Sequence, residues 1–344
     1  MFPDWLTNLQ VEFGSVPRGL EKTSASGVLW QAAPGRFLLD VPGVARYLAE
    51  DGQRLTIEPA PTASESEVAR LARTVPLAAL LYQRGLLAFH AAAVAVPSKM
   101  TAASNLPGGL YEATHNIIGH TDTREDCFIA EEHRIRNDKR SVNSSESTAP
   151  GGLYKARGDN PPNQIGLLLA GDSGAGKSSL LASLLQRGWS MLSDDLAAVG
   201  LDENNQPVIY PVHSEILLWG DALKNLGLNP FPEIETLENG KRAFSATQQF
   251  ASQPVPLHTI AWLRVHSEPT IQIESLRGQK FFQAINTLLY NSHIADALLD
   301  RRDHFHLASA LTQTISIQRL SRPRGAWSVA GLEAKILDLT TQGL

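Results

Sequence analysis

The chain contains 344 residues, of which 43% are hydrophobic and 19% are charged, and its formal net charge at pH 7 is −5. This length predicts up to two domains with a sizeable core, and the acidic balance argues against a general nucleic-acid-binding surface. No apolar run approaches the roughly 18 residues of a membrane-spanning helix, and residues 1–5 do not begin a signal peptide, so we expect a cytoplasmic protein with no membrane partner. The single cysteine, Cys127, cannot form an intramolecular disulfide, in agreement with a reducing compartment.

The N-terminal region alternates apolar runs with turn-forming residues, a pattern typical of a small β-rich module. Strands are expected at residues 27–30, 36–41 and 55–58. A helix is expected at residues 64–84, with Ser64 as N-cap and Glu67 as its capping-box partner. Pro76 is expected to kink or split this helix. Residues 1–85 are therefore predicted to form an N-terminal β-rich module with a connecting helix.

A long polar insertion follows the next apolar run. Residues 86–94 predict a buried strand that carries His90. Residues 97–163 are rich in Ser, Asn, Thr and Gly, and a loop of this kind is either functional, for example a substrate-recognition lid, or a flexible linker. Its three histidines and one cysteine match no tight zinc spacing, so scattered polar residues are favoured over a metal site.

Residues 171–178 read Gly-Asp-Ser-Gly-Ala-Gly-Lys-Ser and fill every position of the phosphate-binding pattern G-x-x-x-x-G-K-[ST]. The glycines let backbone N–H groups point at a phosphate, Lys177 can reach the β and γ oxygens, and the Ser178 hydroxyl can bind Mg²⁺. A glycine-rich turn with an exposed lysine is the alternative, but an apolar strand at 165–170 and an amphipathic helix at 177–185 flank the pattern. The expected nucleotide-binding residues are Gly171, Asp172, Ser173, Gly174, Ala175, Gly176, Lys177, Ser178 and Ser179.

After a turn at residues 186–188, residues 189–199 predict a strand that carries the adjacent carboxylates Asp194 and Asp195. Neighbouring side chains of an extended chain point to opposite faces, so one carboxylate can hold Mg²⁺ while the other accepts a proton only if the strand ends or kinks there. A solvated turn is the alternative. The pair follows Lys177 by one helix and one strand, which returns the chain to the phosphate-binding edge of a sheet and favours a catalytic interpretation.

The C-terminal region mixes further strands and a helix. Strands are expected at residues 259–265 and 271–273, and a helix with one apolar face is expected at residues 281–289.

Four segments together resemble the catalytic domain of the HPr kinase/phosphorylase family, namely residues 86–94, 171–178, 187–189 and 193–195. The phosphate-binding pattern alone is shared by many families, but its combination with His90 and the paired aspartates is far more specific. The resemblance covers residues 86–96 and 164–335, and it is nearest to HPr-kinase-related proteins that accompany peptide-maturation genes, including kinases of lasso-peptide precursors. It implies an α/β fold with a PEP-carboxykinase-like P-loop kinase core at residues 86–344, interrupted by the polar insertion, together with the small N-terminal β-rich module.

The resemblance also implies roles for individual residues. Lys177 and Ser178 match the phosphate-binding and Mg²⁺-binding residues of the family. Asp194 matches the general base and Asp195 the group near the metal, although the two roles can be exchanged. His90 matches a histidine near the transferred phosphate, and a neutral core histidine is the alternative in its apolar run.

Two further positions follow from the resemblance. Glu215 lies where the family often has a second acidic group near the metal, although residues 212–216 depart from the signature of the regulatory kinase. Lys241 and Arg242 resemble a position where a basic residue follows a glycine turn, and a cation there can stabilise charge on a transferring phosphoryl group. A solvated basic turn is an equal alternative.

These features predict an ATP- and Mg²⁺-dependent kinase that phosphorylates a hydroxyl, in the first place a serine of a small protein or of a ribosomally made peptide precursor. The expected catalytic residues are Lys177, Asp194, Asp195 and His90, and the expected metal ligands are Ser178, Asp195 and Glu215. Two alternatives stay open: a nucleotide-dependent peptide-binding scaffold with weak ATPase activity, and a small-molecule kinase of the same fold. The family resemblance further implies a homo-oligomer.

Overall fold

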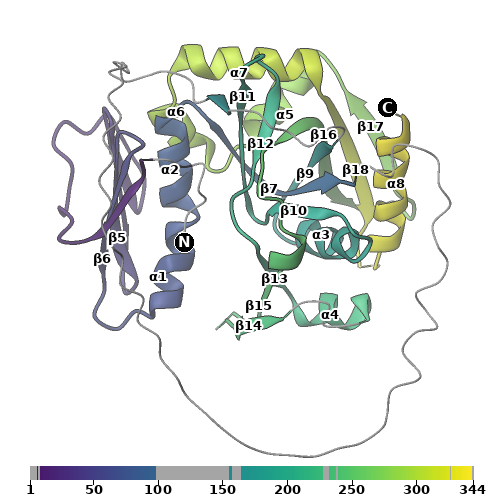
Figure 1. Ribbon diagram of the computed structural model, residues 1–344, viewed down its shortest axis with the longest axis horizontal. Coiled ribbons are helices and arrows are strands. Elements are labelled where there is room, and N and C mark those ends of the chain that lie inside the picture. The colour runs from purple at the N-terminus through teal and green to yellow at the C-terminus, as the bar shows by residue number, and fades with distance from the viewer. Residues whose placement is uncertain are drawn as a thin grey trace, which may run out of the picture. The chain divides into compact units, whose positions relative to one another are not determined.

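The computed structural model describes residues 6, 8–97, 155–156, 164–227, 232–237, 239–325 and 327–342, so most of the insertion predicted at 97–163 lies outside the described residues. The described residues before and after the insertion belong to one compact unit. They form a six-stranded sheet, a nine-stranded central sheet and a three-stranded sheet, with helices packed against them (Figure 1). The chain is thus a mixed α/β protein with an N-terminal β-sheet, as the sequence predicts.

The N-terminal sheet has the strand order β1-β6-β5-β4-β3-β2. Its strands are β1 (Gln10–Phe13), β2 (Ala25–Ser26), β3 (Trp30–Ala33), β4 (Arg36–Val41), β5 (Ala45–Glu50) and β6 (Arg54–Pro59). The strands predicted at 36–41 and 55–58 are confirmed as β4 and β6. The strand predicted at 27–30 is wrong, because Gly27 donates its N–H to the carbonyl oxygen of Trp30 at 2.9 Å and closes a turn between β2 and β3.

The helix predicted at 64–84 is two helices, α1 (Glu65–Ala72) and α2 (Val75–Gln83). The Ser64 hydroxyl accepts a hydrogen bond from the backbone N–H of Glu67 at 3.2 Å, which confirms the predicted N-cap. Pro76 lies in the first turn of α2, where its missing N–H leaves no helical bond unmade, so it helps to begin a second helix. Helix α2 is buried over most of its surface because it packs between the N-terminal sheet and the central sheet (Figure 1).

The central sheet places β9 in its middle. Its strands are β7 (Leu87–Val96), β8 (Lys155–Ala156), β9 (Ile165–Gly171), β10 (Ser190–Ser193), β11 (Leu196–Asp202), β12 (Pro207–Tyr210), β16 (Val255–His266), β17 (Gln272–Leu276) and β18 (Ser316–Pro323). Strand β9, which confirms the apolar strand predicted at 165–170, is parallel to β16 on one side and antiparallel to β7 on the other. Strand β16 continues in parallel with β18.

Helices cover both faces of this sheet. They are α3 (Lys177–Gln186) and α8 (Val329–Gln342) on one face, and α5 (Gln279–Leu288), α6 (Ser292–Leu298) and α7 (Arg301–Thr314) on the other. Leu169 belongs to the same buried cluster as Leu180 of α3 and Leu332 of α8, whereas its neighbour Leu168 belongs to the cluster of Ile285 of α5. Successive side chains of a strand point to opposite faces, so a strand covered on both faces is apolar throughout. The predicted helices at 177–185 and 281–289 are confirmed as α3 and α5.

The small sheet lies beside α3 and has the order β13-β15-β14. It contains β13 (Glu215–Leu218), β14 (Glu233–Thr236) and β15 (Arg242–Ser245), and α4 (Gly220–Leu226) and a 3₁₀ turn (Thr247–Gln249) adjoin it. Strand β13 of this sheet contacts α3. None of the helices in the described part of the chain is long and apolar enough to span a lipid bilayer.

Candidate active site

The phosphate-binding loop connects the end of β9 to the start of α3, as the sequence predicts. Gly171 has a φ of 138°, and a Cβ atom there would collide with the carbonyl oxygen of Leu263 on the neighbouring strand. Gly176 caps α3 in the left-handed region at a φ of 104°. These two positions require glycine, and they aim the free N–H groups of the first helical turn out of the sheet edge. The loop therefore has the conformation and the helix N-terminus that an anion needs.

Lys177 folds back over this loop. Its ammonium donates hydrogen bonds to the carbonyl oxygens of Gly171 at 2.7 Å and Asp172 at 3.3 Å, and the residue is only 7% exposed. Burial lowers the pKa of Lys177, although the negative charges of Asp195 and Asp194 oppose that shift. The cation thus lies inside the loop beside both carboxylates, and the alternative of a turn with an exposed lysine does not describe it.

Arg322 fixes the loop from the end of β18. Its guanidinium donates from Nε to the carbonyl oxygen of Ala175 at 2.9 Å and from Nη2 to that of Gly174 at 2.8 Å. Sequence reasoning missed this residue, because these contacts span 147 and 148 positions and no local pattern marks the arginine.

The paired aspartates interrupt a strand. Strands β10 and β11 both pair with β7 and follow one another along it, and Asp194 and Asp195 lie between them. Asp195 has a φ of 69°, and Ala91 on β7 donates its N–H to the Asp195 carbonyl oxygen at 3.2 Å. The predicted single strand at 189–199 is therefore two strands separated by a kink at the carboxylates, which is the condition under which both side chains can face one site.

The two carboxylates have different environments. Asp194 is 2% exposed and accepts hydrogen bonds from the Ser178 hydroxyl at 3.0 Å and from the Leu217 N–H on β13 at 3.2 Å. Burial, and then the charge of Asp195, raises the pKa of Asp194 to about 6. The side chain of Asp195 is 45% exposed. Asp194 is thus joined to the loop serine, whereas Asp195 faces the open side of the site.

His90 lies on that open side. Its Nδ1 atom is 3.6 Å from the Asp195 Oδ1 atom, its side chain is 36% exposed, and its ring lies 5.5 Å from the ring of Tyr290. Burial, and then the positive charge of Lys177, lowers the pKa of His90, which favours a neutral imidazole at pH 7. His90 also borders a pocket of about 220 Å³ at the loop edge. The other residues that line this pocket are Gly171, Asp172, Trp262, Thr287, Leu288, Leu289, Tyr290 and Asn291.

A larger pocket opens on the other side of the loop. Its volume is about 440 Å³, and it begins at Gly176 and Ser179. The remaining lining residues are Asp221, Asn225, Arg322, Gly325, Trp327, Ser328, Val329 and Leu332. Trp327 is 43% exposed, so part of its indole is accessible to a ligand. Sequence reasoning assigned Gly176 and Ser179 to nucleotide binding and missed the remaining lining residues, which come from separate segments of the chain.

Both carboxylate oxygens of Glu215 are occupied by arginines. Its carboxylate binds Arg70 through Oε1 at 3.0 Å and Arg73 through Oε2 at 2.9 Å. Burial would raise the pKa of Glu215, but Arg73 and Arg70 hold it below the ordinary value. Within the described residues, no group of three or more His, Cys, Asp and Glu side chains is placed to hold a metal ion. The Ser178 hydroxyl oxygen and an Asp194 carboxylate oxygen lie within hydrogen-bond distance, at 3.0 Å.

Lys241 and Arg242, which follow the glycine turn between β14 and β15, have different partners. Arg242 forms an ion pair with Glu233 at the surface. Lys241 lies with its ammonium 5.4 Å from the centre of the Trp219 ring, and its charge acts on both Lys177 and His90. Of the two basic residues, Lys241 is therefore the one near the site.

The buried imidazole of His213, near this site, should make the free energy of unfolding depend on pH. Burial, and then the charge of Arg73, lowers its pKa from 6.5 to about 4. Between these pH values the unfolded chain binds more protons than the folded chain, so the free energy of unfolding falls as the pH falls, by at most roughly 3 kcal/mol. We expect His213→Gln to remove this decline in denaturant unfolding curves recorded between pH 7 and pH 4. The variant His258→Gln should keep the decline, and an unchanged decline in His213→Gln would contradict the assignment.

Comparison with known proteins gives distant structural likeness and no sequence match. No family model matches the sequence, and no curated protein sequence matches it. Among solved structures, the chain is similar to the Hpr(Ser) kinase/phosphatase from Coxiella burnetii, with a TM-score of 0.26 and 15% sequence identity over 52% of this chain and 84% of that chain. The function of the chain has to be inferred from the chemistry of its own site.

Proposed function

We propose that this chain is an ATP- and Mg²⁺-dependent kinase that transfers the γ-phosphoryl group to a hydroxyl of the serine type. The observation that carries this proposal is the pair of pockets on opposite sides of one phosphate-binding loop. The larger pocket begins at Gly176 and Ser179, and the smaller one begins at Gly171 and Asp172 beside His90. Phosphoryl transfer needs a donor and an acceptor in line across the transferred group. Two pockets that border one loop support the proposal, because each could take one of the two reactants.

The donor side fits a nucleoside triphosphate. Loop N–H groups and Lys177 would bind the phosphates, and the larger pocket would take the nucleoside, with the Trp327 indole as a stacking surface. The Ser178 hydroxyl and the Asp194 carboxylate are hard oxygen donors 3.0 Å apart at the first turn of α3. Mg²⁺ prefers one or two such ligands together with phosphate oxygens and water, so these two residues fit it. When bound, Mg²⁺ would neutralise charge on the β and γ oxygens.

This arrangement favours the exchanged roles of the two aspartates, with Asp194 near the metal and Asp195 as the general base. Asp194 is buried against the loop serine and suits the metal, whereas Asp195 lies on the open side beside His90 and suits the general base. The acceptor oxygen forms a bond to the γ-phosphorus as the bond from that phosphorus to the β-bridging oxygen breaks. Asp195 takes the hydroxyl proton, and ADP leaves. A neutral His90 can then hydrogen-bond the acceptor without adding a charge.

The acceptor pocket favours one side chain of a polypeptide over a large metabolite. Its volume of about 220 Å³ is below the roughly 300–1,000 Å³ of pockets that enclose drug-sized molecules. Trp262 and Tyr290 line it with aromatic surface, and Asn291 adds an amide. A serine of a small protein or peptide could enter while its neighbours stay on the surface. Incubating the protein with γ-labelled ATP and pooled serine peptides tests this assignment, and label on serine is the expected result.

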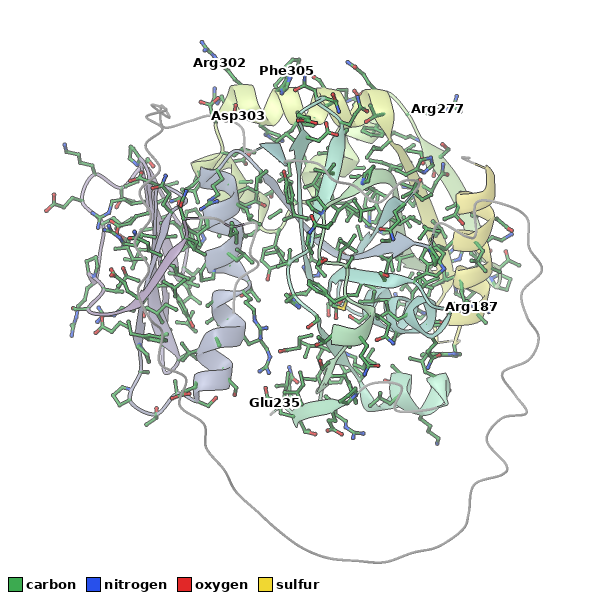
Figure 2. The ribbon with its side chains drawn as sticks, in the orientation of Figure 1. Arg187, Glu235, Arg277, Arg302, Asp303 and Phe305 are labelled. Atoms are coloured by element: carbon green, nitrogen blue, oxygen red, sulfur yellow. The ribbon has the colours of Figure 1, made fainter. Side chains whose placement is uncertain are left out.

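Trp327→Ala should weaken ATP binding by about tenfold, because an aromatic contact with a base contributes about 1–2 kcal/mol. The affinity of inorganic triphosphate should stay within about twofold, since the loop is unchanged. Isothermal titration with both ligands measures the difference. The control is Phe305→Ala on α7, which removes an aromatic side chain that is 72% exposed and labelled in Figure 2 away from the loop. Equal loss in both variants would exclude Trp327 from the nucleoside pocket.

A further inference from the structure

Three ion pairs connect helix α1 and its C-cap residue Arg73 to the small sheet. Arg70 binds Glu215 at 3.0 Å and also binds Glu235, and Arg73 binds the other oxygen of Glu215 at 2.9 Å. Glu235 is labelled in Figure 2 at the end of the small sheet nearest α1. The four side chains are between 14% and 31% exposed. Partly buried, multiply bonded pairs hold their geometry better than isolated surface pairs.

The strand that these arginines hold also touches the candidate active site. Glu215 begins β13, and two residues later the Leu217 N–H donates to the Asp194 Oδ2 atom at 3.2 Å. Strand β13 pairs with β15 and has no other strand partner among the described residues. Strand β13 is therefore bound to the two arginines through the Glu215 side chain and to Asp194 through the Leu217 N–H. Arg70, Arg73, Glu215, Leu217 and both aspartates also border one small cavity of about 40 Å³.

The second glutamate, Glu235, belongs to the same cluster of ion pairs, which we call the arginine clamp (Arg70, Arg73, Glu215 and Glu235). Glu235 lies on β14, which leads through the glycine turn to Lys241. The Lys241 ammonium lies 5.4 Å from the centre of the Trp219 ring, so the placement of β14 and its turn affects where this cation lies. The two arginines therefore hold both the N–H donor to Asp194 and the turn that carries Lys241.

We propose that Arg70 and Arg73 are positioning residues for phosphoryl transfer: through Glu215 and Glu235 they fix the small sheet so that the Leu217 N–H orients Asp194. The N-terminal module is then part of the catalytic unit. This inference rests on the proposed function. Residues that orient a metal-ligating group without contacting the metal or the substrate themselves typically contribute about 10- to 100-fold to activity.

Arg73→Ala and Arg70→Ala should each lower kcat by about tenfold or more, with the KM for ATP within about twofold, because the loop and the nucleoside pocket are untouched. Arg73→Lys should recover most of the lost kcat, since Arg73 makes a single ion pair with Glu215. Arg70→Lys should recover less, because one ammonium cannot reproduce a guanidinium shared by two glutamates. The matched control is Arg46→Ala, which removes a 2.7 Å pair with Glu58 of similar exposure inside the N-terminal sheet. Its kcat should stay within about twofold.

Amide hydrogen exchange separates this inference from the proposed function. In the ATP-free full chain, the Leu217 amide should exchange about tenfold faster in Arg73→Ala than in Arg46→Ala, whether or not any acceptor is known. Faster exchange without phosphoryl transfer in the parent would refute the kinase and leave the arginine clamp standing. Unchanged exchange at Leu217, or a kcat in Arg70→Ala and Arg73→Ala equal to that of Arg46→Ala, would overturn the positioning role.

Discussion

Lys177→Met should lower phosphoryl transfer by about 10²- to 10³-fold while the chain stays folded, because groups that stabilise developing charge on a transferred phosphoryl contribute about 3–4 kcal/mol. Methionine keeps the aliphatic stem but removes the ammonium that bonds to Gly171 and Asp172. Single-turnover transfer from ATP measures the loss, and thermal unfolding checks the fold.

The control for this variant is Lys224→Met on α4, a lysine that is exposed and lines neither pocket. Its transfer rate should equal that of the parent. A Lys177→Met protein with near-normal turnover would show that the loop does not bind the reacting phosphates.

Asp195→Asn should lower the rate of phosphoryl transfer by about 10²- to 10⁴-fold, the range that a positioned proton acceptor contributes. The affinity for ATP should change little. Asp194→Asn should instead raise the Mg²⁺ concentration needed for half-maximal rate, because it replaces the carboxylate that accepts the Ser178 hydrogen bond. The two variants make the same chemical change at adjacent positions, so each is the control for the other.

Titrating Mg²⁺ in both variants assigns the roles. Recovery of Asp194→Asn at high Mg²⁺ without recovery of Asp195→Asn is the expected result. The opposite outcome would restore the order that the family resemblance implies, in which Asp194 is the base.

Local features of the site could be predicted from the sequence because each is encoded within a few residues. The strand, the glycine loop and the helix around Lys177 follow from apolar periodicity and glycine spacing alone. The sequence predicts a single strand across Asp194 and Asp195, and it names a strand end or kink there only as the condition under which both carboxylates act at one place. The Ser64 cap is readable from the local sequence, since its partner lies three residues away.

Features that depend on contacts between distant segments could not be predicted. Nothing near Arg322 indicates that it binds a loop 147 residues earlier, and nothing near Glu215 indicates that it is paired with Arg70 and Arg73. Tyr290 reaches His90 through a long-range contact, in which its backbone N–H bonds to the Ala88 carbonyl oxygen on β7 at 2.8 Å. The strand predicted at 27–30 failed for a related reason, because an apolar composition does not distinguish a strand from an exposed turn.

The transfer of γ-labelled phosphate from ATP to serine tests the proposed kinase activity most directly. The parent and Lys177→Met proteins would each be incubated with Mg²⁺, labelled ATP, pooled serine peptides and matched pools in which alanine replaces serine. We expect label on serine peptides with the parent only, and no label on the alanine pools. Release of labelled phosphate to water by the parent, with none on any peptide, would contradict the kinase and favour a nucleotide-dependent scaffold with weak ATPase activity.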